Sequence, residues 1–285
     1  MVDKYLIQRL EKLLDRIEQL VPPVSQIPNW QKTSAAIWQK NLWTPIKQLS
    51  KLQLNDLQHI EEQKKLLDRN TRQFLKGLPA NNALLWGSKG TGKSSLIKAL
   101  LNAYHHEGLR LIEVDKQHLA DLPLLTEILS QFPQRFIIFS DDLSFEANDA
   151  GYKALKSVLD GSINVAPENV LIYATSNRRH LMPEFGKENT EMHWVNDELH
   201  PGETSEEKIS LSERFGLWLS FYPFNQDRYL EIVDYWLKYH GLSGICEINV
   251  REAALQWALL RGSRSGRAAM QFVRDWVGTK QLHNI

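Results

Sequence analysis

One octet, GSKGTGKS at residues 87–94, constrains this 285-residue chain more than any other stretch. It follows the apolar run ALLW at 83–86 and precedes SSLIKALLNAY at 94–104, which has a helical pattern. Its glycines allow backbone N–H groups to turn inward on an anion, and the start of the following helix adds a partial positive charge. A strand, this loop and a helix in that order predict a triphosphate-binding loop.

The loop residues have individual expected roles. Lys93 is expected to reach the β- and γ-phosphates of the nucleotide, and Ser94 is expected to ligate Mg²⁺. The full expected phosphate-binding set is Gly87, Ser88, Lys89, Gly90, Thr91, Gly92, Lys93, Ser94 and Ser95.

Short apolar runs separated by helical stretches make up the middle of the chain. These runs are ALLWG (83–87), RLIEVD (110–115), RFIIFSDD (135–142), VLIYATSN (170–177) and LWLSFY (217–222). Strands that alternate with helices predict an α/β fold with a parallel, five-stranded sheet covered by helices on both faces. After Pro223 the pattern is helical only, which predicts a small all-helical second domain.

Polar residues stand at the ends of two of these runs. Asp141 is the expected metal-side carboxylate, acting through water, and Asp142 is expected to polarise the attacking water, with Glu146 as its alternative. Asn177 ends the next run, where it could touch both the γ-phosphate and that water, with Thr175 and Ser176 as alternatives. The competing interpretations are a solvated acidic turn and a strand-end cap.

Two arginines complete the expected site. Arg214 lies just before the fifth run and is expected to point out of its own subunit toward a neighbour's nucleotide; the alternative is an ion pair with Glu213 or another acid. Arg267 opens a helix of the second domain and could reach the γ-phosphate in cis, with Arg261 and Arg264 as competitors.

These elements, in this order, resemble the AAA+ superfamily of ATPases. The matching parts are the Walker A loop (87–94), the Walker B strand (136–142), sensor 1 (Asn177), the arginine finger (Arg214) and sensor 2 (Arg267). The "DD" ending and the "SERFG" box look like the replication initiator DnaA. Longer strings, among them FSDDLSFE and LIYATSNRRHL, resemble an uncharacterised bacterial AAA+ family filed as domain of unknown function 815.

The resemblance implies ATP and Mg²⁺ as ligands, and it brings no known substrate. It also implies that the segment near LQHI lines the adenine pocket, which makes Leu57, His59 and Ile60 candidates. The chain departs from the general pattern at Asp142, where Glu is common, and in the long stretch between Asn177 and Arg214.

The overall composition and charge of the chain exclude few classes of function. The 34 basic and 34 acidic side chains give no whole-protein reason to expect nucleic acid or a membrane surface as a partner. The single cysteine, Cys246, rules out an internal disulfide and suits a reducing compartment. No apolar run approaches the roughly 20 residues that span a bilayer, so we expect a cytoplasmic protein.

The flanking regions are predicted less sharply. Residues 3–21 predict an amphipathic helix that packs on its own core or on a partner, and 24–50 an irregular arm anchored by Trp30, Trp38 and Trp43 rather than a nucleic-acid platform. A helix is expected from residue 54, with Asn55 or Asp56 as its cap. The acidic stretch 183–208 predicts a flap or a solvated loop, with Trp194 as a possible contact point, and its spacing of His193, His200, Glu191 and Asp197 fits no standard metal site.

We therefore expect three parts: an arm at 1–53, a nucleotide-binding domain at 54–223 and a helical lid at 224–285. The favoured function is a slow ATPase, a homo-oligomer through Arg214, that remodels or loads an unidentified protein or nucleic-acid client. The alternative is a nucleotide-gated assembly switch with little hydrolysis. The order of the polar elements argues against a small-molecule kinase.

Overall fold

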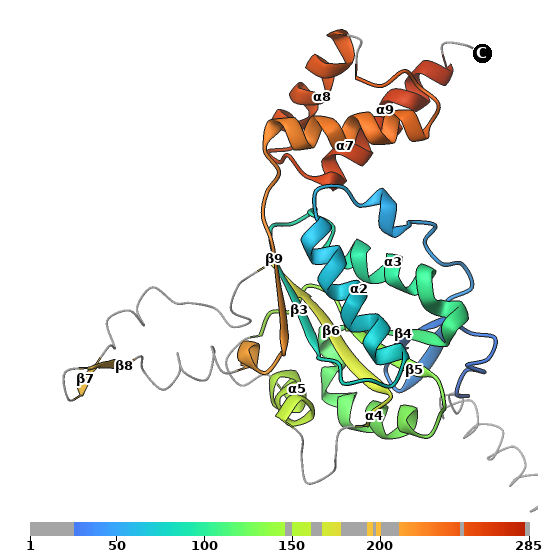
Figure 1. Ribbon diagram of the computed structural model, residues 1–285, viewed down its shortest axis with the longest axis vertical. Helices are drawn as coiled ribbons and strands as arrows, with labels where there is room; N and C mark the ends of the chain where they lie inside the picture. The colour runs from blue at the N-terminus through green and yellow to red at the C-terminus, as the bar shows by residue number, and fades with distance from the viewer. Residues whose placement is uncertain are drawn as a thin grey trace, which may run out of the picture.

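One seven-stranded sheet organises the chain, with strand order β2-β1-β4-β5-β6-β3-β9 (Figure 1). The computed structural model describes residues 26–145, 150–160, 167–177, 211–245 and 248–282, and the backbone of 193–195 and 198–200. The strands of the sheet are β1 (Ala35–Gln39), β2 (Leu42–Pro45), β3 (Ala83–Gly87), β4 (Leu109–Val114), β5 (Arg135–Ser140), β6 (Val170–Ser176) and β9 (Leu217–Phe221). All neighbouring pairs are parallel except β1 with β2.

Helices cover both faces of this sheet. The α-helices of the body are α2 (Glu61–Leu75), α3 (Lys93–Tyr104), α4 (Leu122–Ser130) and α5 (Ala150–Asp160), and three short 3₁₀ turns are η1 (Leu54–Asp56), η2 (His105–Glu107) and η3 (Lys116–Asp121). Successive strand residues enter different cores: Ile137 packs with α2 and α3, whereas Ile138 packs with α4 and α5. This alternation, in strands that are apolar throughout, confirms the predicted two-sided burial of a parallel sheet.

The five predicted strands are β3, β4, β5, β6 and β9, and the sheet holds two more. Residues 35–45, expected to be irregular, form a hairpin in which Trp38 lies opposite Trp43. Lys40 and Asn41 both have positive φ, as a two-residue hairpin turn requires. The spacing of five between the tryptophans, which fits no helix, is the spacing that this turn produces.

The three arm tryptophans are buried, which confirms that they anchor this region. The Trp30 and Trp43 rings meet at 5.4 Å, and Trp38 donates its indole N–H to Asp121 over 2.9 Å. Arg110, buried on β4, donates to the carbonyl oxygen of Trp30 over 2.6 Å. Rings packed in this way cannot serve as a stacking platform for nucleic acid.

The helix expected from residue 54 begins later, at Glu61. The segment before it forms η1 and then turns sharply, because His59 has a φ of 62° and cannot continue a right-handed helix. Asp56 does not cap α2; it accepts the backbone N–H of Gln53 over 2.7 Å. The resulting bend directs residues 54–60 toward the second domain.

That second domain is helical, as predicted, with α7 (Gln226–Tyr239), α8 (Ile248–Leu260) and α9 (Gly266–Leu282). Figure 1 shows these three helices gathered beyond the end of β9, from which the chain passes directly into α7. Within the described residues, no helix combines the length and the apolar character needed to cross a membrane.

Several predicted features lie outside the described residues. They are the helix at 3–21, Glu146, Cys246 and most of the acidic stretch 183–208. Within that stretch the backbone forms one antiparallel pair, β7 (His193–Val195) with β8 (Glu198–His200). Among the side chains that the structure does describe, no cluster of three or more potential metal-ligating residues of the His, Cys, Asp and Glu types occurs.

Gly87, where β3 enters the loop, provides a test of this architecture. Its φ is 127°, and a Cβ there would lie 2.0 Å from the carbonyl oxygen of Phe221, a backbone atom in the neighbouring strand. Gly87→Ala should therefore lower the free energy of unfolding by more than about 3 kcal/mol, since overpacking adds to left-handed strain. Gly108→Ala is the matched control, because its φ is 97° and its Cβ would meet nothing within 4 Å. Urea denaturation should give that control a loss of only about 1–2 kcal/mol; equal losses would contradict the close approach.

Candidate nucleotide-binding site

A cavity of about 370 Å³ opens between the carboxyl ends of the strands and the helical domain. Its polar part comes from the octet loop and from the ends of β5 and β6. The lining residues are Leu52, Asp56, Leu57, Gln58, Ile60, Lys89, Gly90, Thr91, Gly92, Lys93, Ser94, Ser95, Asp141, Asp142, Thr175, Asn177, Phe224, Ile232, Trp236, Gly266, Arg267 and Met270. Ligands of open α/β sheets bind in such a crevice beyond the carboxyl ends of the strands.

The octet wraps around the ammonium group of Lys93. Lys93 Nζ donates to the carbonyl oxygens of Gly87 and Ser88, each at 2.7 Å, and to Asn177 Oδ1 at 3.2 Å. Burial lowers the pKa of Lys93 to about 8, although the carboxylates of Asp141 and Asp142 act in the opposite direction. The side chain is 7% exposed. A cation with a weakened hold on its proton therefore stands at the base of the cavity.

The two carboxylates predicted from the Walker B strand lie beside the loop. Ser94 Oγ donates to Asp141 Oδ1 over 2.6 Å, so the predicted metal ligands are already in contact. A hydroxyl and a carboxylate are both oxygen donors of the kind that Mg²⁺ prefers, and this donor set fits that ion. Asp142 follows with a φ of 52°, which is uncommon for a residue other than glycine.

Asn177 joins these groups from the end of β6. Its amide oxygen accepts from Lys93, and its amide nitrogen donates to Asp142 Oδ1. The alternatives at this strand end lie differently: Ser176 Oγ donates to the carbonyl oxygen of Leu143 over 2.8 Å, and Thr175 contacts the two aspartates. Asn177 is thus the residue that lies between the loop lysine and the second carboxylate.

Of the three lid arginines that were candidates for this role, Arg267 is the one that lines the cavity. Its backbone N–H donates to the carbonyl oxygen of Gly90 over 3.3 Å, which ties the start of α9 to the octet. Arg261 instead stacks on Trp257 at 5.0 Å, and Arg264 lines a separate groove on the lid.

Arg214 lies away from the cavity lining. Within the chain its guanidinium Nε pairs with the carboxylate of Asp160 at the end of α5. In the isolated chain Arg214 therefore forms the ion pair that was its alternative prediction, and the acid is Asp160 rather than Glu213. Its role toward a neighbouring subunit stays a prediction.

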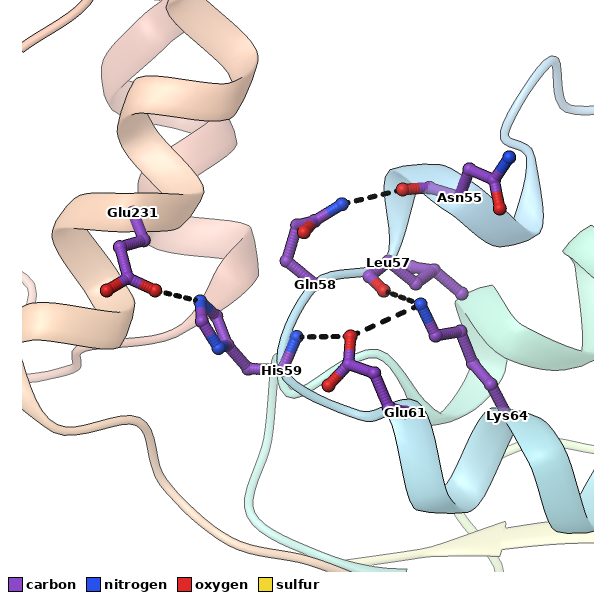
Figure 2. Close-up of polar contacts among 7 residues, drawn as sticks. All are labelled: Asn55, Leu57, Gln58, His59, Glu61, Lys64 and Glu231. Atoms are coloured by element: carbon purple, nitrogen blue, oxygen red, sulfur yellow. Dashed lines mark hydrogen bonds and ion pairs between the residues drawn. The ribbon is translucent and has the colours of Figure 1, made fainter.

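The expected adenine segment contributes two of its three candidates. Leu57 and Ile60 line the cavity, whereas His59 does not. Figure 2 shows the His59 ring turned toward the lid, where its Nε2 lies 2.9 Å from Glu231 of α7. The left-handed backbone at His59 directs its side chain outward while its neighbours stay inside.

The apolar half of the cavity was missed by reasoning from the sequence. Leu52 comes from the arm, Phe224 from the linker, and Ile232, Trp236 and Met270 from the lid. Each of these residues belongs to an amphipathic or irregular segment. The sequence of such a segment indicates that its apolar residues are buried, but it does not indicate which surface they contact. Together with Leu57 and Ile60 they form the apolar part of the cavity lining, next to the polar loop.

The sheet with the octet loop at the carboxyl ends of its strands, followed by a helical second domain, is the fold of AAA+ proteins. The family described as "Protein of unknown function (DUF815)" matches residues 31–280, and the chain belongs to that family. No curated protein matches the sequence.

Two solved structures show the same fold at low identity. The Thermotoga maritima RuvB P216G mutant has 15% identity and a TM-score of 0.53, over 82% of this chain and 68% of that one. The Aeropyrum pernix Orc1 protein, solved in complex with DNA, has 17% identity and a TM-score of 0.51, over 78% of this chain. This chain spans 61% of that Orc1 chain, less than two thirds of its length.

Tyr235 offers a test of how the lid is held on the cavity. Its hydroxyl donates to Asp56 Oδ1 over 2.6 Å, and burial, with help from Asp56, raises the Tyr235 pKa to about 12. The neutral phenol is thus the form that the fold favours, and its contribution is complete below pH 10 and is lost as the pH rises through 12.

At neutral pH, Tyr235→Phe should lower the free energy of unfolding by about 1 kcal/mol, since it leaves Asp56 without this donor. Tyr239→Phe is the control, one turn along α7 and 61% exposed. Chemical denaturation should leave the control unchanged within about 0.5 kcal/mol. Equal behaviour of the two variants would show that the contact does not hold the lid.

Proposed function

We propose that this protein binds ATP with Mg²⁺ and hydrolyses it slowly. One observation carries the proposal: Lys93, Ser94, Asp141, Asp142 and Asn177 meet at the polar end of a cavity whose other end is apolar. A triphosphate needs the first surface and a purine base needs the second.

Binding is assigned to the octet. Lys93 exchanges its bonds to the Gly87 and Ser88 carbonyls for the terminal phosphates, while the loop amides and the start of α3 hold the remaining charge. Ser94 and Asp141 would hold Mg²⁺, which when bound neutralises charge on the phosphate oxygens. Leu57, Ile60 and the lid residue Trp236 enclose the base.

Hydrolysis is assigned to Asp142 and Asn177. In-line attack on the γ-phosphate needs a residue that orients the attacking water molecule. The Asp142 carboxylate would take that role, and the Asn177 amide would hold the same water against the phosphate. The contact between Asn177 and Asp142 supports this pairing. Arg267 would read the γ-phosphate from the lid, and its backbone bond to Gly90 couples the lid to the loop.

A nucleotide-gated switch is the second candidate, and one observation favours it. Asp142 is one methylene shorter than the glutamate common at this position. A carboxylate that reaches less far would orient water poorly and slow the reaction without affecting binding. The switch would then work by assembly in the ATP state, with hydrolysis as a rare reset.

The proposed client is a macromolecule, either protein or nucleic acid. The Orc1 relative was solved in complex with DNA, which supports nucleic acid as one class to test. A formal net charge of zero gives this chain no general attraction to DNA, so any such contact would have to be local.

Calorimetry at several pH values tests the assigned role of Lys93 in ATP binding. In the free protein the pKa of Lys93 is about 8, and phosphate charge should raise it, so that ATP binding at pH 9 takes up a fraction of a proton. We expect ATP affinity to fall by up to about tenfold per pH unit above pH 8, the limit for one linked proton. Titrations in buffers of different ionisation enthalpy measure the uptake.

Lys93→Met should abolish both the proton uptake and most of the affinity. Lys98→Met, five residues further along α3 and outside the cavity lining, is the matched control and should bind as the unchanged protein does. Unchanged protein that gives no binding heat with MgATP would refute the proposal outright.

Turnover as a function of protein concentration tests whether a neighbour completes the site. If Arg214 leaves Asp160 to reach an adjacent subunit, ATP turnover per subunit should rise with concentration, because such arginines contribute about 10³–10⁵ in rate. Arg214→Ala should remove that rise while ATP affinity stays the same. Arg228→Ala, an exposed arginine on α7, is the control. Turnover that is measurable yet flat across dilution would contradict a shared site, and tight binding with negligible turnover throughout would favour the switch.

A further inference from the structure

Thr175, the penultimate residue of β6, is buried against the two aspartates of the site. It is 1% exposed, yet it lines the cavity. In the parallel pairing of β5 with β6, Ser140 lies opposite Ala174, so the next position along brings Asp141 opposite Thr175. The register of the sheet, and not the loop sequence, therefore fixes this neighbour.

The Thr175 hydroxyl makes two different hydrogen bonds. It donates to Asp141 Oδ1, and it accepts the backbone N–H of Asp142 over 2.9 Å. The carbonyl oxygen of the same residue accepts the N–H of Leu143 over 2.7 Å. Thr175 thus holds three successive residues after the end of β5.

These bonds fix two features of the site: the orientation of the Asp141 carboxylate and the backbone conformation of Asp142. Asp141 Oδ1 accepts from Ser94, from Thr175 and, over 3.2 Å, from the N–H of Asp142, which together fix the carboxylate in one rotamer. Among the described residues, all three of these bonds end on Oδ1 and none ends on Oδ2. The backbone of Asp142 is left-handed, a conformation with a steric cost of about 1–2 kcal/mol, and the bond from its N–H to Thr175 helps to offset that cost.

We propose that Thr175 is a positioning residue, which orients Asp141 toward Mg²⁺ and sets the backbone turn that presents Asp142. The inference rests on the proposed function, because it assigns a role within the same site. Thr175 is not assigned contact with the nucleotide. Outer-shell partners of this kind typically contribute about 10- to 100-fold to metal affinity when they are removed.

Thr175 and its neighbour Ser176 provide a matched pair of positions for testing this role. Thr175→Val keeps the shape of the side chain and removes both hydroxyl bonds, whereas Thr175→Ser keeps the hydroxyl and removes only a methyl group. Ser176→Ala is the control for loss of a buried hydroxyl in the same strand, because Ser176 Oγ donates to the Leu143 carbonyl and neither aspartate. A merely structural role would affect Thr175→Val and Ser176→Ala alike.

The measurement is ATP affinity by calorimetry, once in excess EDTA and once in saturating Mg²⁺. The ratio of the two affinities gives the strengthening by Mg²⁺. Thr175→Val should match the unchanged protein in EDTA and lose about tenfold or more of the strengthening. Thr175→Ser should recover most of it, and Ser176→Ala should keep it.

Each outcome decides the inference. If Thr175→Val retains the full strengthening by Mg²⁺, or loses affinity equally in EDTA, Thr175 does not position the metal ligand. If Thr175→Val does not fold, as judged by circular dichroism, Thr175→Ala replaces it in the comparison with Thr175→Ser. If the unchanged protein binds no ATP under either condition, the proposed function fails, which is a separate result from failure of the Thr175 role.

Discussion

The parallel pairing of β5 with β6 is the constraint on which the candidate site depends. Parallel strands end at the same edge of a sheet, so this pairing brings the residues after β5 next to those at the end of β6. The contacts of Asp141 with Thr175, and of Asp142 with Asn177, both follow from it. β3 lies on the other side of β6 and delivers the octet to the same edge. Two adjacent ladders of backbone hydrogen bonds therefore align three separate segments to within contact distance.

The lid completes the cavity through a small number of contacts with the body. Arg267 N–H reaches Gly90, Tyr235 reaches Asp56, and His59 reaches Glu231. All three join the lid to segments that bend at left-handed residues, Gly90 with a φ of 74° and His59 with a φ of 62°. Among the described residues the polar contacts at this boundary are few, and apolar residues of the lid line the cavity itself. A ligand that fills the cavity would therefore add directly to what holds the lid in place.

The polar half of the site was largely predictable from the sequence, and the apolar half was not. Lys93, Ser94, Asp141, Asp142 and Asn177 stand next to glycines or at strand ends, where a polar residue has few structural reasons to be. Trp236 and Met270 lie in helices whose apolar residues all look alike from the pattern. His59 shows the opposite error, because its position in an adenine-pocket segment indicated contact, while a left-handed φ turned it toward Glu231.

The sequence by itself determined five of the strands, the loop chemistry and the helical second domain, because each depends on local pattern: apolar runs, glycine spacing and helical periodicity. Only the tertiary structure decided that residues 35–45 extend the sheet, that Arg267 rather than Arg261 or Arg264 meets the loop, and that Thr175 lies against Asp141. These facts depend on strand register and on the angle between two domains. Both are set by the packing of many side chains at once, so they cannot be predicted from any short stretch of the sequence.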